Sequence, residues 1–129
     1  MYYGALEAGG TKMVCAIGDA DKNIIDRISI PTGTPEQSVP AMIDYFKKYD
    51  ISALGIGTFG PADINPNSPT YGSIMRSPKK DWEGFSLYKA FTDALGCLVV
   101  VDTDVNAAAW GEYLYGALKG LNSGMYLTV

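Results

Sequence analysis

The chain has 129 residues and a formal net charge of −4, and 47 % of its residues are hydrophobic and 19 % charged. This composition is typical of one globular domain and excludes a disordered chain. The negative charge and the absence of any Lys/Arg block argue against a surface that binds nucleic acid or an anionic membrane.

The first thirty residues predict three short strands at hairpin spacing. Short GGT and ADK turns separate these strands, and no charged and then apolar leader precedes Tyr2, so no signal peptide is expected. The strand segments are YYGALEA (2–8), KMVCAIGD (12–19) and NIIDRISIP (23–31).

A helix is predicted over TPEQSVPAMIDYFKKY, residues 34–49. Thr34 is a suitable N-cap and Pro35 suits the first helical position. The apolar residues that follow are spaced at i, i+3, i+4 and i+7, which places them on one helix face. They are Val39, Met42, Ile43 and Phe46.

A buried strand, ISALGIGTFG, leads into residues 61–82, which contain four prolines and no clear periodicity. A long irregular segment inside a compact domain is usually a functional loop. Two interpretations stay open: a surface loop that Trp82 anchors, or a flap over a polar ligand. Lys79 and Lys80 are expected to be solvated charges more than phosphate contacts.

The last third of the chain alternates helices with strands. The predicted order is a helix between Ser86 and Gly96, a strand (CLVVVDT), a helix (DVNAAAWGEYLYGALKG) and one more strand (GMYLTV). The Ala-Ala-Ala run and Gly111 would permit close packing of the second helix. Three early strands followed by alternating helices and strands predict a mixed α/β sheet with helices on its faces.

The two cysteines, Cys15 and Cys97, lie in apolar runs and lack the close spacing of a metal site. We expect buried, reduced thiols. No apolar run is long enough to cross a bilayer, so a cytoplasmic protein is expected.

The segment EAGGTK, residues 7–12, has two interpretations. Gly9 and Gly10 would suit a two-residue hairpin turn with positive φ. Alternatively, glycines let backbone N–H groups approach an anion, with a hydroxyl from Thr11 and a charge from Lys12. The spacing of a Walker A loop is missing.

The segment DTDVNAAAWGE places Asp102 and Asp104 where a strand gives way to a helix. An aspartate there can be a plain N-cap, or a carboxylate at a sheet edge where sites assemble. An ionised carboxylate that accepts a hydroxyl proton is what phosphoryl transfer to an alcohol requires. GTFGP, residues 57–61, is a glycine turn expected at the same edge, or an ordinary tight turn.

Together these segments resemble the N-terminal half of ROK-family sugar kinases, most closely their bacterial fructokinase branch. EAGGTK is similar to the first phosphate motif, and GIGTFGP, YGSIMRSPKKDW and VDTDVNAAAWGE are similar to the next three signatures in the same order. The resemblance covers essentially the whole chain. It implies a ribonuclease H-like α/β lobe of the actin and hexokinase type, with residues 1–129 as a single N-terminal domain.

The resemblance also implies a role for each matching residue near the sugar. Asp104 matches the catalytic base that takes the proton of the sugar hydroxyl, and Thr103 resembles a sugar contact. Asn106 matches a residue that holds the loop. Gly60 and Pro61 resemble a turn that lines the sugar pocket.

On the nucleotide side, the resemblance implies that Gly9, Gly10, Thr11 and Lys12 surround the phosphates of ATP. Glu7 takes the place of the usual Asp and would orient water on Mg²⁺. The implied reaction is ATP-dependent phosphorylation of fructose to fructose 6-phosphate. The alternatives are a kinase for glucose, mannose or an N-acetylhexosamine, and a sugar-sensing ROK regulator without catalysis.

Two departures from the family pattern stand out. Ser77 replaces the more usual Thr before Pro-Lys, which keeps the hydroxyl. The family continues past the MYLTV strand with a second phosphate turn, a His/Cys zinc site and the adenosine pocket, whereas this chain contains no histidine. We therefore expect one lobe of a two-lobed enzyme, inactive alone and a homodimer at full length, with Zn²⁺ only in the part that lies beyond residue 129.

Overall fold

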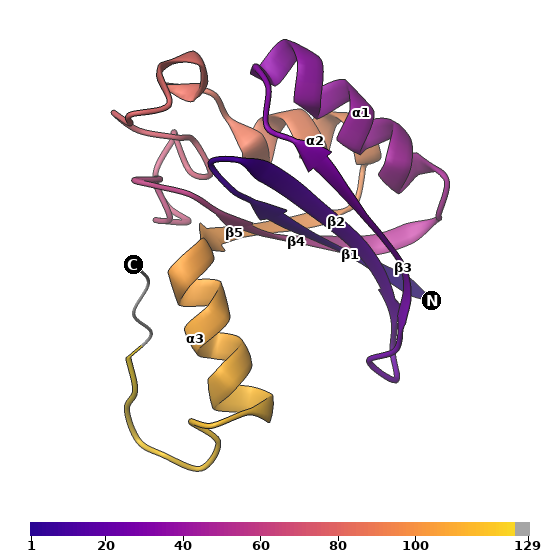
Figure 1. Cartoon of the computed structure of the whole chain (residues 1–129), viewed down its shortest axis with the longest axis vertical. Coiled ribbons are helices and arrows are strands. Elements are labelled where there is room, and N and C mark those ends of the chain that lie inside the picture. The colour runs from indigo at the N-terminus through magenta and orange to yellow at the C-terminus, as the bar shows by residue number, and fades with distance from the viewer. Residues whose placement is uncertain (126–129) are drawn as a thin grey trace.

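The computed structural model describes residues 1–125, and these residues form a mixed five-stranded sheet flanked by helices (Figure 1). The strand order within the described residues is β3-β2-β1-β4-β5, which confirms the predicted α/β class. The expected strand at GMYLTV lies outside the described residues, except for its first two positions. The strands are β1 (Tyr2–Ala8), β2 (Lys12–Asp19), β3 (Ile24–Pro31), β4 (Ile51–Thr58) and β5 (Leu98–Thr103).

The sheet is antiparallel on one side and parallel on the other. β1, β2 and β3 form consecutive antiparallel hairpins, as expected from their short turns. β1 pairs in parallel with β4, and β4 in parallel with β5. Ala8 is opposite Thr58, and Thr58 is opposite Thr103, so the carboxyl ends of three neighbouring strands meet at one edge of the sheet.

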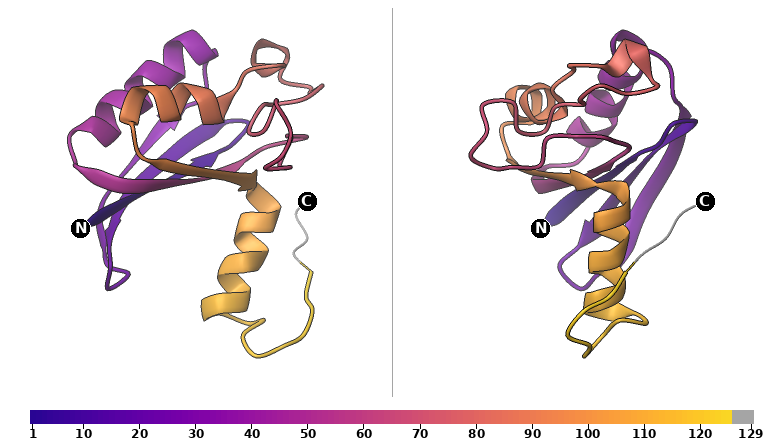
Figure 2. Two further views of the ribbon diagram at one scale, coloured as in Figure 1. Left: turned by 180° about the vertical axis from the view of Figure 1, so that it is seen from behind. Right: turned by 90° about the vertical axis from the view of Figure 1, so that its left-hand side faces the viewer.

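The helices are distributed unequally between the two faces of the sheet. Helices α1 (Pro35–Lys47) and α2 (Leu87–Leu95) cover one face, while α3 (Asp104–Tyr115) starts at the end of β5 and extends away on the other side (Figures 1 and 2). A short 3₁₀ helix, η1, covers Lys80–Trp82. Alternation along β1 follows from this arrangement, because Leu6 is buried in the hydrophobic core while Glu7 is exposed.

Local capping explains where the helices begin and end. Thr34 is the N-cap of α1, and its backbone N–H donates to the Gln37 Oε1 at 3.0 Å. The Ser86 Oγ accepts the Lys89 N–H at 3.1 Å at the start of α2. Gly96 ends α2 with φ 64°, a left-handed conformation that favours glycine. The predicted caps are therefore confirmed.

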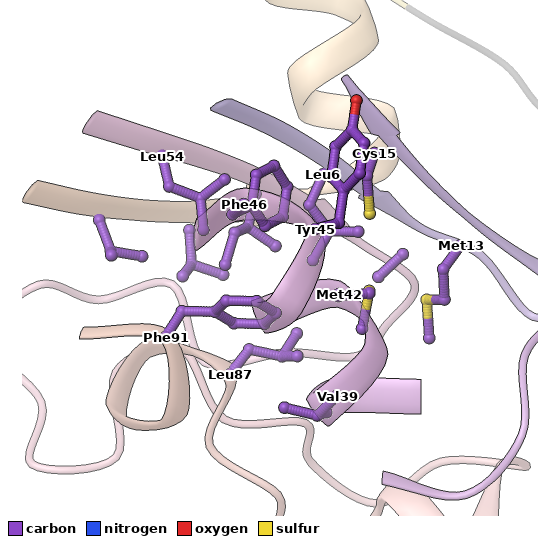
Figure 3. Close-up of a cluster of buried hydrophobic side chains, with 14 of the residues drawn as sticks. Leu6, Met13, Cys15, Val39, Met42, Tyr45, Phe46, Leu54, Leu87 and Phe91 are labelled. Atoms are coloured by element: carbon purple, nitrogen blue, oxygen red, sulfur yellow. The ribbon is translucent and has the colours of Figure 1, made fainter. Parts of the chain in front are cut away.

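The hydrophobic core lies between the sheet and the two covering helices, where side chains of both layers interdigitate (Figure 3). The predicted apolar face of α1 is confirmed, with Ile43 at its partly buried margin, and Tyr45 joins it as an additional buried residue. Labelled core residues in the close-up are Leu6, Met13, Cys15, Val39, Met42, Tyr45, Phe46, Leu54, Leu87 and Phe91.

The segment between β4 and α2 is tied to the rest of the fold by two aromatic side chains. The Tyr71 hydroxyl donates to the Val101 carbonyl at 3.1 Å and accepts the Val101 N–H at 2.7 Å. Trp82 is 1 % exposed, and its indole N–H donates to the Gly33 carbonyl at 2.9 Å. The prediction that Trp82 anchors this segment is therefore confirmed.

Asp63 organises the tip of the same segment. Its Oδ2 accepts hydrogen bonds from the hydroxyls of Ser68 and Thr70, and its Oδ1 accepts the Asn65 N–H at 3.0 Å. These donors, led by Ser68, lower the pKa of the Asp63 carboxyl below its ordinary value. A twenty-residue stretch without periodicity is thus an ordered loop.

Neither cysteine forms a disulfide within the described residues. Cys15 is buried, and desolvation raises the pKa of its thiol to about 12, so the thiol stays protonated and unreactive near neutral pH. Of the helices in residues 1–125, none has the length and apolar character needed to span a membrane.

A hydrogen bond between Tyr49 and Asp26 predicts how the stability of the fold changes at acidic pH. The Tyr49 hydroxyl, just after α1, donates to the Asp26 Oδ2 on β3 at 2.7 Å, and this bond is the main reason why the pKa of Asp26 is lowered. Replacing Tyr49 with Phe should raise that pKa toward its ordinary value of about 3.9. A carboxyl group whose pKa is lower in the folded state than in the unfolded state stabilises the fold at pH values above its unfolded-state pKa. Wild type should therefore lose this stabilisation as the pH falls through the folded-state pKa of Asp26, and Y49F should lose less.

Carbon-detected NMR titration of the Asp26 carboxyl measures this directly. Tyr2 is the matched control, because its ring packs edge-on against Tyr49 at 6.0 Å and it is not among the groups that shift the pKa of Asp26. Y2F should leave the titration of Asp26 unchanged. An unchanged Asp26 titration in Y49F would contradict the assignment of the bond.

Candidate active site

The parallel strands bring three chain segments to one edge of the sheet. The turn 9–11 follows β1, the Phe59–Pro61 segment follows β4, and Asp104 follows β5. The Phe59 N–H donates to the Ala8 carbonyl at 2.8 Å, which joins the first two segments. Two strand spacings of about 4.8 Å each separate the end of β1 from the end of β5, so about 10 Å lies between them.

The turn after β1 has a geometry that differs from the expected one. Neither Gly9 nor Gly10 has a φ in the left-handed region, so the prediction of a positive-φ hairpin turn is wrong. Gly9 is required for another reason: a Cβ there would lie 2.7 Å from the Lys12 carbonyl oxygen, to which the Gly9 N–H also donates at 3.0 Å. The close approach of the two strands, not the handedness of the turn, excludes a side chain.

The end of β3 holds this turn in place from outside. The Thr32 hydroxyl donates to the Gly9 carbonyl at 2.8 Å, and the Thr32 N–H donates to the Thr11 carbonyl at 3.0 Å. Within residues 1–125, the N–H groups of Gly10 and Thr11 have no hydrogen-bond acceptor. Two free amides in a fixed turn are donors for an anion such as phosphate.

The junction between β5 and α3 is fixed by its own side chains. Thr103 is the N-cap, and its Oγ accepts the Asn106 N–H at 3.2 Å. The Asn106 side-chain amide donates to the Asp102 Oδ1 at 2.9 Å, so Asn106 holds this junction together. Asp104 is the first residue of the helix and not its cap, so the N-cap interpretation of this aspartate is wrong.

The first turn of α3 approaches β4 closely at Gly57, whereas nothing in the described part of the chain contacts Gly111 further along the helix. A Cβ on Gly57 would lie 3.1 Å from the Ala107 Cβ, so Gly57 allows the helix to start next to the sheet. Among the described residues, no α3 side chain is buried and nothing lies within 4 Å of a Cβ on Gly111. The expected close packing is therefore seen at Ala107 of the Ala-Ala-Ala run and is wrong for Gly111.

The helix also ends earlier than predicted, at Tyr115 and not at Gly120. Gly116 is its C-cap, and the Gly116 N–H donates to the Glu112 carbonyl. The Lys22 ammonium of the β2–β3 turn lies 4.4 Å from the Tyr115 ring centroid, a cation–π contact that connects the far end of α3 to the sheet.

A cavity of about 670 Å³ lies between the open face of the sheet and α3. Its floor includes Gly55 and Gly57 of β4, and Trp110 of α3 forms part of its wall. Its acidic lining residues come from three elements and are Glu7, Asp102 and Asp104. The volume lies within the range of small-molecule sites.

The acidic side chains suit a hydrated magnesium ion better than a fully protein-bound metal. No group of three or more His, Cys, Asp or Glu side chains in residues 1–125 is arranged to hold a metal ion. Mg²⁺ usually keeps several waters and takes only one or two carboxylates, together with substrate phosphates. Glu7 and Asp102 could therefore contact Mg²⁺ through its waters.

The structure separates the residues singled out from the sequence into two neighbouring groups. Glu7 and Asp104 line the cavity, while the segments 9–12 and 60–61, with Thr103, lie at the adjoining sheet edge. Sequence reasoning missed Trp110 and the glycines of the cavity floor. The alternating small residues of GIGT were the available signal for that floor, since each second residue of a strand faces the same side.

Comparisons with known proteins give a consistent result. A model of the ROK family matches residues 3–129. A relative from Bacillus subtilis is 45 % identical over 126 residues, which cover 98 % of this chain and 42 % of that protein. A fructokinase of Pediococcus pentosaceus is 43 % identical and covers all of this chain, which matches 45 % of the fructokinase. The chain thus spans less than half the length of these relatives.

A solved structure agrees with the sequence comparisons. The ROK family glucokinase of Streptomyces griseus, in complex with glucose and AMPPNP, superimposes with a TM-score of 0.77 at 30 % identity. The match covers 93 % of this chain and 38 % of the glucokinase. This likeness agrees with the ribonuclease H-like lobe expected from the sequence.

Proposed function

The chain belongs to the ROK family, and we propose that the complete protein is an ATP-dependent fructokinase of the cytoplasm, acting as a homodimer. The observation that carries this proposal is the placement of Asp104 at the same sheet edge as the free amides of Gly10 and Thr11. A base for a hydroxyl proton and donors for a phosphate group are the two parts that phosphoryl transfer to a sugar requires.

In the proposed reaction, the 6-hydroxyl of fructose gives its proton to the Asp104 carboxylate. The hydroxyl oxygen forms a bond to the γ-phosphorus of ATP, and the bond from that phosphorus to the β,γ-bridging oxygen breaks, which releases ADP. Asp104 is the first residue of α3, and its Oδ1 accepts the Val105 N–H at 2.8 Å, which orients the carboxyl group. Positioning and charge neutralisation supply most of such catalysis.

The roles of the other residues follow from their places at the edge. Gly9, Gly10, Thr11 and Lys12 would bind the phosphates of ATP, and Gly60, Pro61 and Thr103 would line the sugar pocket. The Thr103 oxygen already accepts a hydrogen bond from Asn106, which leaves its hydroxyl proton for a sugar oxygen. Bound Mg²⁺ would neutralise the charge of the triphosphate, with Glu7 contacting its water.

Fructose is proposed over other hexoses because the sequence identity is higher to a fructokinase than to a glucokinase. The chain is 43 % identical to the fructokinase of Pediococcus pentosaceus and 30 % identical to the glucokinase of Streptomyces griseus. The resemblance of the sequence to the fructokinase branch, in which Glu7 takes the place of the usual Asp, supports the same choice of sugar.

A coupled assay of ADP release by the full-length protein tests the proposal. The acceptors are fructose, glucose, mannose, N-acetylglucosamine and N-acetylmannosamine at matched concentrations. We expect the highest kcat/KM for fructose. A higher value for another hexose would correct the substrate, and turnover of none of these sugars would refute the kinase assignment.

The 129 residues alone should not complete catalytic cycles. They span 45 % of the Pediococcus pentosaceus fructokinase, and a phosphoryl-transfer site must exclude water and enclose both substrates. We expect no fructose phosphorylation above background in an assay that detects product below one turnover per chain. Repeated turnover by this chain would contradict the prediction.

A further inference from the structure

We propose that Lys79 binds the terminal phosphate groups of the nucleotide at the turn 9–11. This inference rests on the proposed kinase function and adds a residue that lies far from the turn in the sequence. Lys79 was expected to be a solvated charge, and its place in the fold argues for a different role.

The side chain of Lys79 reaches the turn at Gly10. Its Cε is 3.6 Å from the position that a Cβ on Gly10 would occupy, an ordinary van der Waals contact. The ammonium nitrogen is one bond beyond that carbon. Rotation of this exposed side chain brings the ammonium toward an anion bound at the Gly10 and Thr11 amides, which have no acceptor within the described residues.

The backbone of Lys79 is held on both sides by buried neighbours. The Lys79 N–H donates to the Oγ of Ser77, which is 3 % exposed, at 3.2 Å. The Lys79 carbonyl accepts the Trp82 N–H at 3.0 Å, and Trp82 is itself bonded to Gly33. A lysine on such an anchored segment is preorganised, so little backbone freedom is lost when it contacts a ligand.

The charge of Lys79 is not neutralised by a protein carboxylate. Among residues 1–125 the one ion pair is between Lys80 and Glu83, at 3.7 Å. Lys79 thus remains available, whereas its neighbour Lys80 is already paired. An unpaired ammonium that can reach the same anion as two free backbone amides has the chemistry that recognises a phosphate group.

The two adjacent lysines provide a matched experiment on the full-length enzyme. Titration calorimetry with AMPPNP would be compared for wild type, K79M and K80M, together with KM values for ATP and fructose. Loss of a charge-assisted hydrogen bond predicts about 10- to 100-fold weaker AMPPNP binding for K79M. K80M and the fructose KM should change less than about twofold, and K79R should restore part of the affinity.

The outcomes separate this inference from the proposed function. Wild type that turns over no sugar would refute the kinase assignment, and nucleotide affinity would still report on Lys79. Unchanged AMPPNP binding by K79M, equal losses in K79M and K80M, or a selective rise in the fructose KM would each overturn the role of Lys79. Thermal denaturation identifies a variant that fails to fold, and K79R then decides the question.

Discussion

Replacing Asp104 with Asn in the full-length enzyme should lower kcat for fructose by about 10²- to 10⁴-fold. The amide cannot accept the hydroxyl proton, and a positioned base contributes about this factor to such reactions. The loss corresponds to about 3–5 kcal/mol in the activation free energy. Asn keeps the size of the side chain, and its Oδ1 can still accept the Val105 N–H that Asp104 accepts at 2.8 Å, so α3 should still begin at the same residue.

Steady-state kinetics with saturating ATP and fructose measures the effect. Asp44 is a suitable control, because it is an exposed carboxylate on α1, on the opposite side of the sheet from the cavity. D44N removes the same charge and should retain wild-type kcat. Near-normal turnover by D104N would show that Asp104 is not the base.

Replacing Trp82 with Ala should lower the free energy of unfolding by about 3–5 kcal/mol. The indole is 1 % exposed, packs edge-on against Phe59 and Phe85 at ring distances of 6.1 and 5.6 Å, and donates to the Gly33 carbonyl. The substitution removes all of these contacts and leaves the Gly33 carbonyl without this donor. Since whole domains are stable by about 5–15 kcal/mol, a large part of the stability depends on this side chain.

Urea denaturation of the 129-residue chain, followed by circular dichroism, measures this difference. The second tryptophan, Trp110, provides the comparison because it is 61 % exposed and stacks on Tyr113 at the surface. W110A should cost less than about 1 kcal/mol. Equal losses in the two variants would contradict the assignment of Trp82 as the anchor of residues 61–82.

The features that were predictable from the sequence depend on residues close together along the chain. Alternation of apolar residues in β1 and β2 and the caps at Thr34, Ser86 and Gly96 report local conformational preferences, and these were confirmed. Which strand ends form the site was also predictable, because the carboxyl ends of neighbouring parallel strands lie at the same edge of the sheet.

The features that were not predictable arise from contacts between distant segments. Thr32 holds the turn after β1, so the conformation of that turn depends on a residue more than twenty positions away. Trp82 reaches Gly33 across 49 positions, and nothing in the local sequence indicates this partner. The exposed far half of α3 was missed because helical periodicity does not tell which turns of a helix meet the sheet.

The double hydrogen bond of Tyr71 has a consequence for solubility. Within the described residues β5 has a strand neighbour on one side only, and its apolar side chains Leu98 and Val100 are exposed. An unpaired edge of this kind is a template on which another polypeptide can add a strand and start aggregation. Because the Tyr71 hydroxyl occupies both the N–H and the carbonyl of Val101, an incoming strand cannot continue its ladder past that residue. One phenol thereby protects the exposed edge of the sheet against intermolecular growth.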